Sequence, residues 1–207
     1  MRAGSFKTKG VILSLIVTYI NFKMPEERII SGLNEDAIWQ QVNADFSINP
    51  DPLGYHVVLQ QESRRVLLDM DIDLGGGFES GSAFTTFSSY LFGRDAFRFA
   101  IHREGFLDEI GKFFGMQDVV LGFGDFDKRF VVKTNDEAKT IELFSDAELR
   151  NTLTSLPDLS FGIVQYLLES TDDKAPFLEL RIEDGITDPD ILRKAYHSFF
   201  SVLEKLD

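Results

Sequence analysis

Apolar and polar residues alternate along much of the chain between residues 55 and 183. Successive side chains of a strand point to opposite faces, so such alternation is typical of strands that bury one face. The clearest case is residues 63–74, where Asp69, Asp71 and Asp73 alternate with Leu68, Met70, Ile72 and Leu74. Further strands are predicted at residues 55–60, 83–90, 96–102, 119–121, 126–134, 159–169 and 177–183.

Helical spacing interrupts the strands at irregular intervals. Asn34 is a suitable capping residue for a helix with apolar positions at Ile38 and Val42, and the turn-forming residues 49–54 end it. Residues 105–115 also have helical spacing, with Gly115 placed to close the helix.

Three more helices are predicted towards the C-terminus. Short helices begin at Asn135 and at Ser145, and residues 145–148 match the capping box, in which serine and glutamate bind each other's backbone amides. The last helix is capped by Thr187 or Asp188. Its apolar face carries Leu192, Ala195, Phe199, Leu203 and Leu206.

Runs of strands with helices inserted between them, and no regular alternation of strand and helix, predict an α+β fold. We expect a mainly antiparallel sheet with flanking helices, including the amphipathic C-terminal helix. Residues 24–207 are predicted to form a single domain, although a weak seam near residues 122–125 could divide it into two subdomains.

Residues 1–23 differ in composition from the rest of the chain. Arg2, Lys7 and Lys9 precede a short apolar run at residues 11–20, the order found in an export signal, but no small-residue cleavage site follows. About 20 apolar residues are needed to cross a membrane, so the run is too short for a stable span. Three interpretations remain: an upstream extension or tail, a signal or anchor, or an integral strand or helix.

Charge and composition exclude several functional classes. The chain is acidic, with a formal net charge of −13 and a pI near 4.6, so it repels nucleic-acid phosphates. Its basic pairs are scattered along the chain, which also argues against nucleic-acid binding. The chain has no cysteine, which excludes disulfides, thiol catalysis and zinc sites built on thiolates. Its 20 phenylalanines, beside one tryptophan, indicate an aromatic core.

The three aspartates of residues 69–73 are the first place to look for a metal site, because oxygen ligands suit hard cations. They fail as a calcium-binding EF-hand loop: Leu74 stands where glycine is required and Ser80 where a glutamate belongs. The prediction is a solvated strand face without metal. The alternative is a metal-dependent enzyme that uses these aspartates with Glu79 or His102.

Other candidate groups lack a functional context. The glycine-rich residues 75–82 lack the lysine of a phosphate-binding loop and precede a strand, so we interpret them as a connection. His56, His102 and His197 stand alone, without a metal-binding or nucleophile motif. At Phe199-Phe200, one ring is expected in the core and the next at its boundary, where an outward ring could also mark an interface.

Three segments carry a resemblance: residues 115–120 (Gly-Met-Gln-Asp-Val-Val), residues 126–136 (Phe-Asp-Lys-Arg-Phe-Val-Val-Lys-Thr-Asn-Asp) and the helix at residues 149–156. Over roughly the C-terminal half, the chain resembles uncharacterised bacterial proteins of unknown function. The resemblance implies a bacterial origin and carries over no catalytic residues.

We therefore expect a non-catalytic interaction or ligand-binding domain with an unknown protein or small-molecule partner. No catalytic, cofactor-binding or metal-binding residue is assigned, and no cofactor is expected. A cytoplasmic location is expected, or an exported or N-terminally anchored one if residues 1–23 act as a signal.

The composition change at Met24 generates a first prediction. A chain that begins at Met24 should unfold cooperatively, with the same midpoint as the full chain in a thermal melt followed by circular dichroism. Loss of the cooperative transition would show that the apolar run belongs to the core.

Overall fold

The computed structural model describes residues 28–76, 80–92, 96–103, 116–167 and 174–206. The described strands are β1 (Arg28–Gly32), β2 (Gly54–Gln61), β3 (Arg64–Asp73), β4 (Ser82–Tyr90), β5 (Phe99–Arg103), β6 (Gln117–Val119), β7 (Phe130–Thr134), β8 (Leu159–Leu167) and β9 (Lys174–Ile182). The described helices are α2 (Glu35–Ile48), α3 (Gly124–Arg129), α4 (Glu137–Leu143), α5 (Ala147–Ser155) and α6 (Pro189–Leu206).

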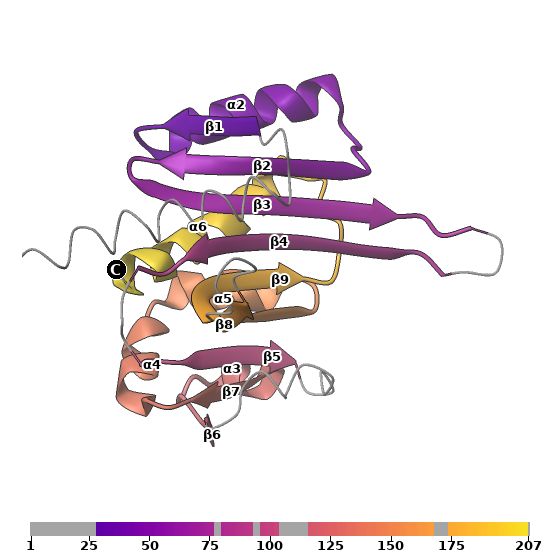
Figure 1. The fold of residues 1–207 in the computed structure, drawn as a ribbon. Helices are drawn as coiled ribbons and strands as arrows, with labels where there is room; N and C mark the ends of the chain where they lie inside the picture. Colours follow the sequence, from indigo (N-terminus) through magenta and orange to yellow (C-terminus); the bar gives the residue numbers. More distant parts are fainter. Residues whose placement is uncertain (1–27, 77–79, 93–95, 104–115, 168–173, 207) are drawn as a thin grey trace, which may run out of the picture.

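The nine strands form one sheet in the order β1-β2-β3-β4-β9-β8-β5-β7-β6. Strands β1 and β2 pair in parallel, and every other pairing in this sheet is antiparallel. The prediction of an α+β fold with a mainly antiparallel sheet is confirmed. Figure 1 shows the β3–β4 hairpin extending beyond the neighbouring strands at the end that carries the aspartates.

The described helices all pack against the same face of the sheet. One continuous core joins buried residues of every described helix to alternate residues of the strands, such as Leu68 and Phe87. The intervening residues, such as Asp69 and Thr86, point to the opposite face. We call this opposite side the helix-free face, because none of the described helices packs on it.

Helix α6 occupies the centre of the helix layer and runs obliquely across the middle strands (Figure 1). The Phe199 ring is fully buried and lies 6.1 Å from both the Phe87 ring on β4 and the Phe161 ring on β8. One turn earlier, Tyr196 contacts the Trp39 ring of α2 at 5.9 Å. These contacts confirm the predicted apolar face of the C-terminal helix, and they tie the two halves of the sheet to one helix.

Residues 126–134 were predicted as one strand, and that prediction is wrong for the first part. Residues 124–129 form α3, and β7 begins at Phe130. Four residues separate Phe126 from Phe130, and their rings pack together with a centroid distance of 4.9 Å. The alternating pattern alone did not separate a helical turn from the strand that follows it.

The predicted capping box at Ser145 is also wrong. Asp146 caps α5 by accepting a hydrogen bond from the Glu148 amide, whereas the Ser145 hydroxyl donates to the Glu142 carbonyl of the preceding helix. Similarly, α4 is capped by Asp136 and not by Asn135. The caps predicted at Asn34 and, as one of two choices, at Asp188 are confirmed.

Three further points of the sequence analysis have different outcomes. Strand β1 was not predicted. Phe200 packs at the boundary of the core, as expected: it is 7% exposed and stacks on Tyr196 at 5.5 Å. Residues 1–23 and the predicted helix at 105–115 lie outside the described residues.

The position of Phe199 generates a second prediction. Phe199→Ala should lower the free energy of unfolding by about 3–5 kcal/mol, because it leaves a cavity where α6 meets the sheet. Chemical denaturation measures this change.

Phe92→Ala is the matched control, because Phe92 is 55% exposed and its removal should change stability far less. A loss below about 1 kcal/mol for Phe199→Ala would mean that α6 is peripheral.

Candidate functional site

A row of polar side chains crosses the helix-free face in register. Strand pairing aligns, in spatial order, His56 (β2), Asp69 (β3), Thr86 (β4), Arg181 (β9), Ser160 (β8) and His102 (β5). Adjacent strands lie about 4.8 Å apart, so the row is roughly 24 Å long. We call these six residues the polar row.

The aspartate strand forms one end of this surface. Asp71 and Asp73 are exposed on the projecting hairpin, while Leu68 and Met70 on the other face are fully buried, which confirms the predicted division for this part of the strand. The prediction is wrong for Leu74, which follows the end of β3 and is 73% exposed. Asp69 differs from the other two carboxylates: its Oδ1 lies 2.5 Å from Nδ1 of His56. The histidine that stood alone in the sequence is therefore half of an ion pair when protonated.

The structure does not bring the groups of the metal-dependent alternative together. His102 lies on β5, and strands β4, β9 and β8 separate it from Asp69 on β3. Glu79 lies outside the described residues. Among the described residues, no group of three or more His, Asp or Glu side chains is placed to hold a metal ion.

Arg181 occupies the middle of the polar row. Its guanidinium lies over the Phe84 ring at 4.4 Å and its Nε donates to Glu183 at 2.7 Å. A guanidinium held by a ring and a carboxylate loses little further freedom when a partner docks beside it. Arg181 is therefore a preorganised part of the surface.

Two polar atoms of the row are buried and have no hydrogen-bond partner among the described residues: Oγ1 of Thr86 and Nε2 of His102. The Nδ1 atom of His102 lies 3.0 Å from the Arg103 carbonyl, which accepts a hydrogen bond when Nδ1 carries the proton. That tautomer leaves Nε2 as an unused acceptor. Buried polar groups are rarely left unpaired, so both atoms are exceptions to the usual pairing.

Aromatic side chains form a second feature of the helix-free face. Val164, Ala175 and Phe177 are buried together, apart from the main core, and Tyr90 and Tyr166 pack against them. The Phe92 ring contacts Tyr90 at 4.7 Å and remains 55% exposed. Burial raises the pKa of Tyr90, so its hydroxyl stays protonated over a wider pH range. We call this group the Tyr90–Phe177 cluster.

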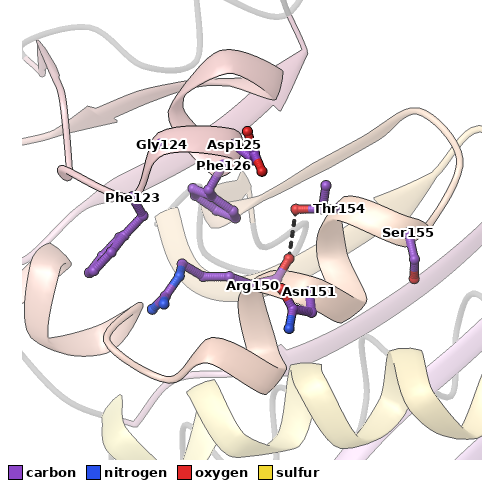
Figure 2. A pocket seen from close by; sticks show the side chains of 8 residues that line it. All are labelled: Phe123, Gly124, Asp125, Phe126, Arg150, Asn151, Thr154 and Ser155. Carbon is purple, nitrogen blue, oxygen red and sulfur yellow. Dashed lines mark hydrogen bonds between the residues drawn. The ribbon is translucent and has the colours of Figure 1, made fainter.

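A depression of about 480 Å³ lies elsewhere, between α3 and α5 (Figure 2). Its lining residues are Phe123, Gly124, Asp125, Phe126, Arg150, Asn151, Thr154 and Ser155. The Thr154 hydroxyl donates to the Arg150 carbonyl at 2.7 Å and the Ser155 hydroxyl to the Thr152 carbonyl at 2.8 Å. These hydroxyls therefore donate their protons to backbone carbonyls of their own helix.

Sequence reasoning missed both the polar row and the α3–α5 depression. The row depends on strand order: Arg181 lies next to Thr86, and Ser160 next to Arg181, only because β9 and β8 follow β4 in the sheet. The depression depends on α3, of which residues 126–129 were predicted as strand. A helix near residue 145 was predicted, although with the wrong cap, but no local signal indicated that α3 lies beside it.

The aspartate strand generates a third prediction. Saturation with calcium, magnesium or manganese should leave the melting midpoint unchanged, whereas a genuine site would raise it by roughly 5–10 °C. The double substitution Asp71→Asn and Asp73→Asn should leave stability equal or slightly higher, because it relieves repulsion between like charges.

Asp69→Asn serves as the contrast, because it removes the negative charge that pairs with His56 and should cost at most about 1 kcal/mol at this partly exposed position. A metal-dependent rise that disappears when all three aspartates are replaced would favour the metalloenzyme.

No helix among the described residues is both long enough and apolar enough to cross a membrane. Comparison of this chain with family models, with curated proteins and with solved structures found no match.

Proposed function

We propose that this chain is a non-catalytic binding module that recognises a protein partner through the helix-free face of its sheet. The observation that supports this most directly is the one-sided helix layer: every described helix packs on the same face. The opposite face presents the polar row and the Tyr90–Phe177 cluster side by side. The resemblance of the C-terminal half adds the expectation of a bacterial source.

The dimensions of the surface suit a protein partner. Nine strands at about 4.8 Å spacing give a width of roughly 40 Å, and six residues of strand give a length of about 20 Å. The product, about 800 Å², is the area that one partner contributes to a standard protein interface. Small ligands are usually bound in deep concavities, and the depression between α3 and α5 lies away from this face.

Charge and composition indicate what the partner presents. The chain carries a net charge of −13, and Asp71 and Asp73 are exposed at one end of the face. The exposed Phe92 ring lies at the Tyr90–Phe177 cluster. Interfaces combine an apolar or aromatic centre with a polar rim of complementary charge. The partner surface is therefore basic, with apolar residues that contact the exposed Phe92 ring beside the buried part of the cluster.

A random peptide library displayed on phage and selected against the full chain tests this proposal. Selected peptides should be rich in lysine or arginine together with aromatic residues. Amide chemical shifts should place them on β3, β4 and β9. Ser88→Arg introduces a bulky cation in the middle of the helix-free face and should abolish their binding.

Gln40→Arg makes the same change of charge on the exposed surface of α2 and should leave binding intact. Peptides that bind to the helix layer, or binding that survives Ser88→Arg, would show that the helix-free face is not the recognition surface.

A further inference from the structure

The depression between α3 and α5 contains an arginine that is held in place before any ligand arrives. The Arg150 guanidinium lies 3.8 Å from the centre of the Phe123 ring, and its Nη1 donates to the Phe144 carbonyl at 2.6 Å. Figure 2 shows Arg150 and Phe123 next to each other at one end of the depression. Within the described part of the chain, the Arg150 side chain donates this one hydrogen bond. The other N–H groups of the guanidinium are therefore available to a ligand.

The loop that carries Phe123 is fixed as well. The Asp127 carboxylate accepts the Leu121 amide at 2.9 Å and the Phe123 amide at 2.6 Å. Between these two residues, Gly122 has φ +84°, a conformation that favours glycine. Because the turn is closed by its own carboxylate and glycine, the Phe123 ring keeps its position relative to α5.

The remaining polar groups of the depression limit what it can recognise. The Thr154 and Ser155 hydroxyls are bound to backbone carbonyls of α5. Asn151 is exposed and offers an amide beside Arg150 on the same helix. The rim carboxylate of Asp125 is paired with Lys128 at 3.2 Å, which offsets its repulsion of an incoming anion. The available recognition groups are thus a guanidinium, an amide and the half-buried Phe123 ring.

We propose that the α3–α5 depression binds a carboxylate carried on a flat apolar body. The planar guanidinium of Arg150 matches the two oxygens of a carboxylate, and Asn151 supplies a further donor. The half-buried Phe123 ring provides an apolar wall for the flat body, and the buried Phe126 ring lies at the base of the depression. A volume of about 480 Å³ is sufficient for such a group. The site is separate from the helix-free face, so this proposal does not depend on the proposed function.

Benzoate is the probe, and benzamide is its uncharged counterpart of the same shape. Proton–nitrogen correlation spectra of the full chain should show saturable shifts of the Arg150 Nε–H and of the amides of residues 123–126 with benzoate. Benzamide should bind at least tenfold more weakly, because it lacks the second anionic oxygen. Equal affinity for the two compounds would overturn the proposal.

Substitutions of Arg150 distinguish recognition by the planar guanidinium from attraction by positive charge alone. Arg150→Lys keeps the positive charge but loses the planar fork, and should weaken benzoate binding about tenfold or more. Arg65→Lys is the matched control, because Arg65 is an exposed residue of β3, and it should leave the affinity for benzoate unchanged. If Arg150→Lys loses its cooperative melt, Asn151→Ala replaces it, because this exposed side chain can be removed without unfolding and should weaken binding several-fold. Unchanged affinity in the folded variant would contradict the proposal.

The carboxylate can come from a free aromatic acid or from a chain end of another protein. N-acetylphenylalanine, titrated beside benzoate, distinguishes these sources because it carries the carboxylate as a C-terminal residue does. Tighter binding of N-acetylphenylalanine identifies a peptide terminus as the occupant, and tighter binding of benzoate identifies a free acid. Absence of saturable shifts with both compounds would overturn the proposal.

Discussion

The fold depends on burying one face of a nine-stranded sheet beneath a single layer of helices. Phe199 lies at the centre of this contact, between Phe87 on β4 and Phe161 on β8, which belong to opposite halves of the sheet. Neighbouring rings extend the contact: Phe161 to Phe99 on β5 at 5.8 Å, and Phe99 to Phe144 after α4 at 5.5 Å. Edge and tilted ring contacts of this kind add to the free energy gained by burying apolar area. Many of the phenylalanines therefore stabilise the packing of helices and strands against one another.

The one-sided core explains the character of the opposite face. Each strand must present apolar residues to the helices at every second position, which leaves the alternate positions free to be polar. In the strands at the centre of the sheet these positions hold Asp69, Thr86, Arg181 and Ser160, aligned by antiparallel register. A binding surface therefore arises from the same alternation that builds the core, without any inserted motif.

The sheet edges are protected in ways that favour recognition through a face over strand addition. At one edge, the Gln41 side chain of α2 donates to the Ser31 carbonyl of β1 at 2.9 Å, which occupies an edge acceptor. At the other edge, β6 has three residues, and its Asp118 pairs with Lys133 of β7 at 2.5 Å. Short strands and charged residues at edges discourage pairing with another chain.

The sequence by itself determined the features that depend on local periodicity. It placed Asp69, Asp71 and Asp73 on one side of a strand and identified the buried face of α6, because both follow from side-chain geometry within one element. It also predicted the α+β class. It failed at residues 124–129, where the Phe126–Phe130 spacing suits a helix but the surrounding alternation suits a strand. In the helical form, the Phe126 ring packs against Phe144. Only the tertiary structure decided the register of the strands and their order across the sheet, and therefore that His56 meets Asp69 and that Arg181 stands between Thr86 and Ser160. It also decided how α5 packs beside the loop before α3, where Arg150 stacks on Phe123. These contacts join residues whose separation along the chain carries no periodic signal, because they depend on how whole elements pack against one another.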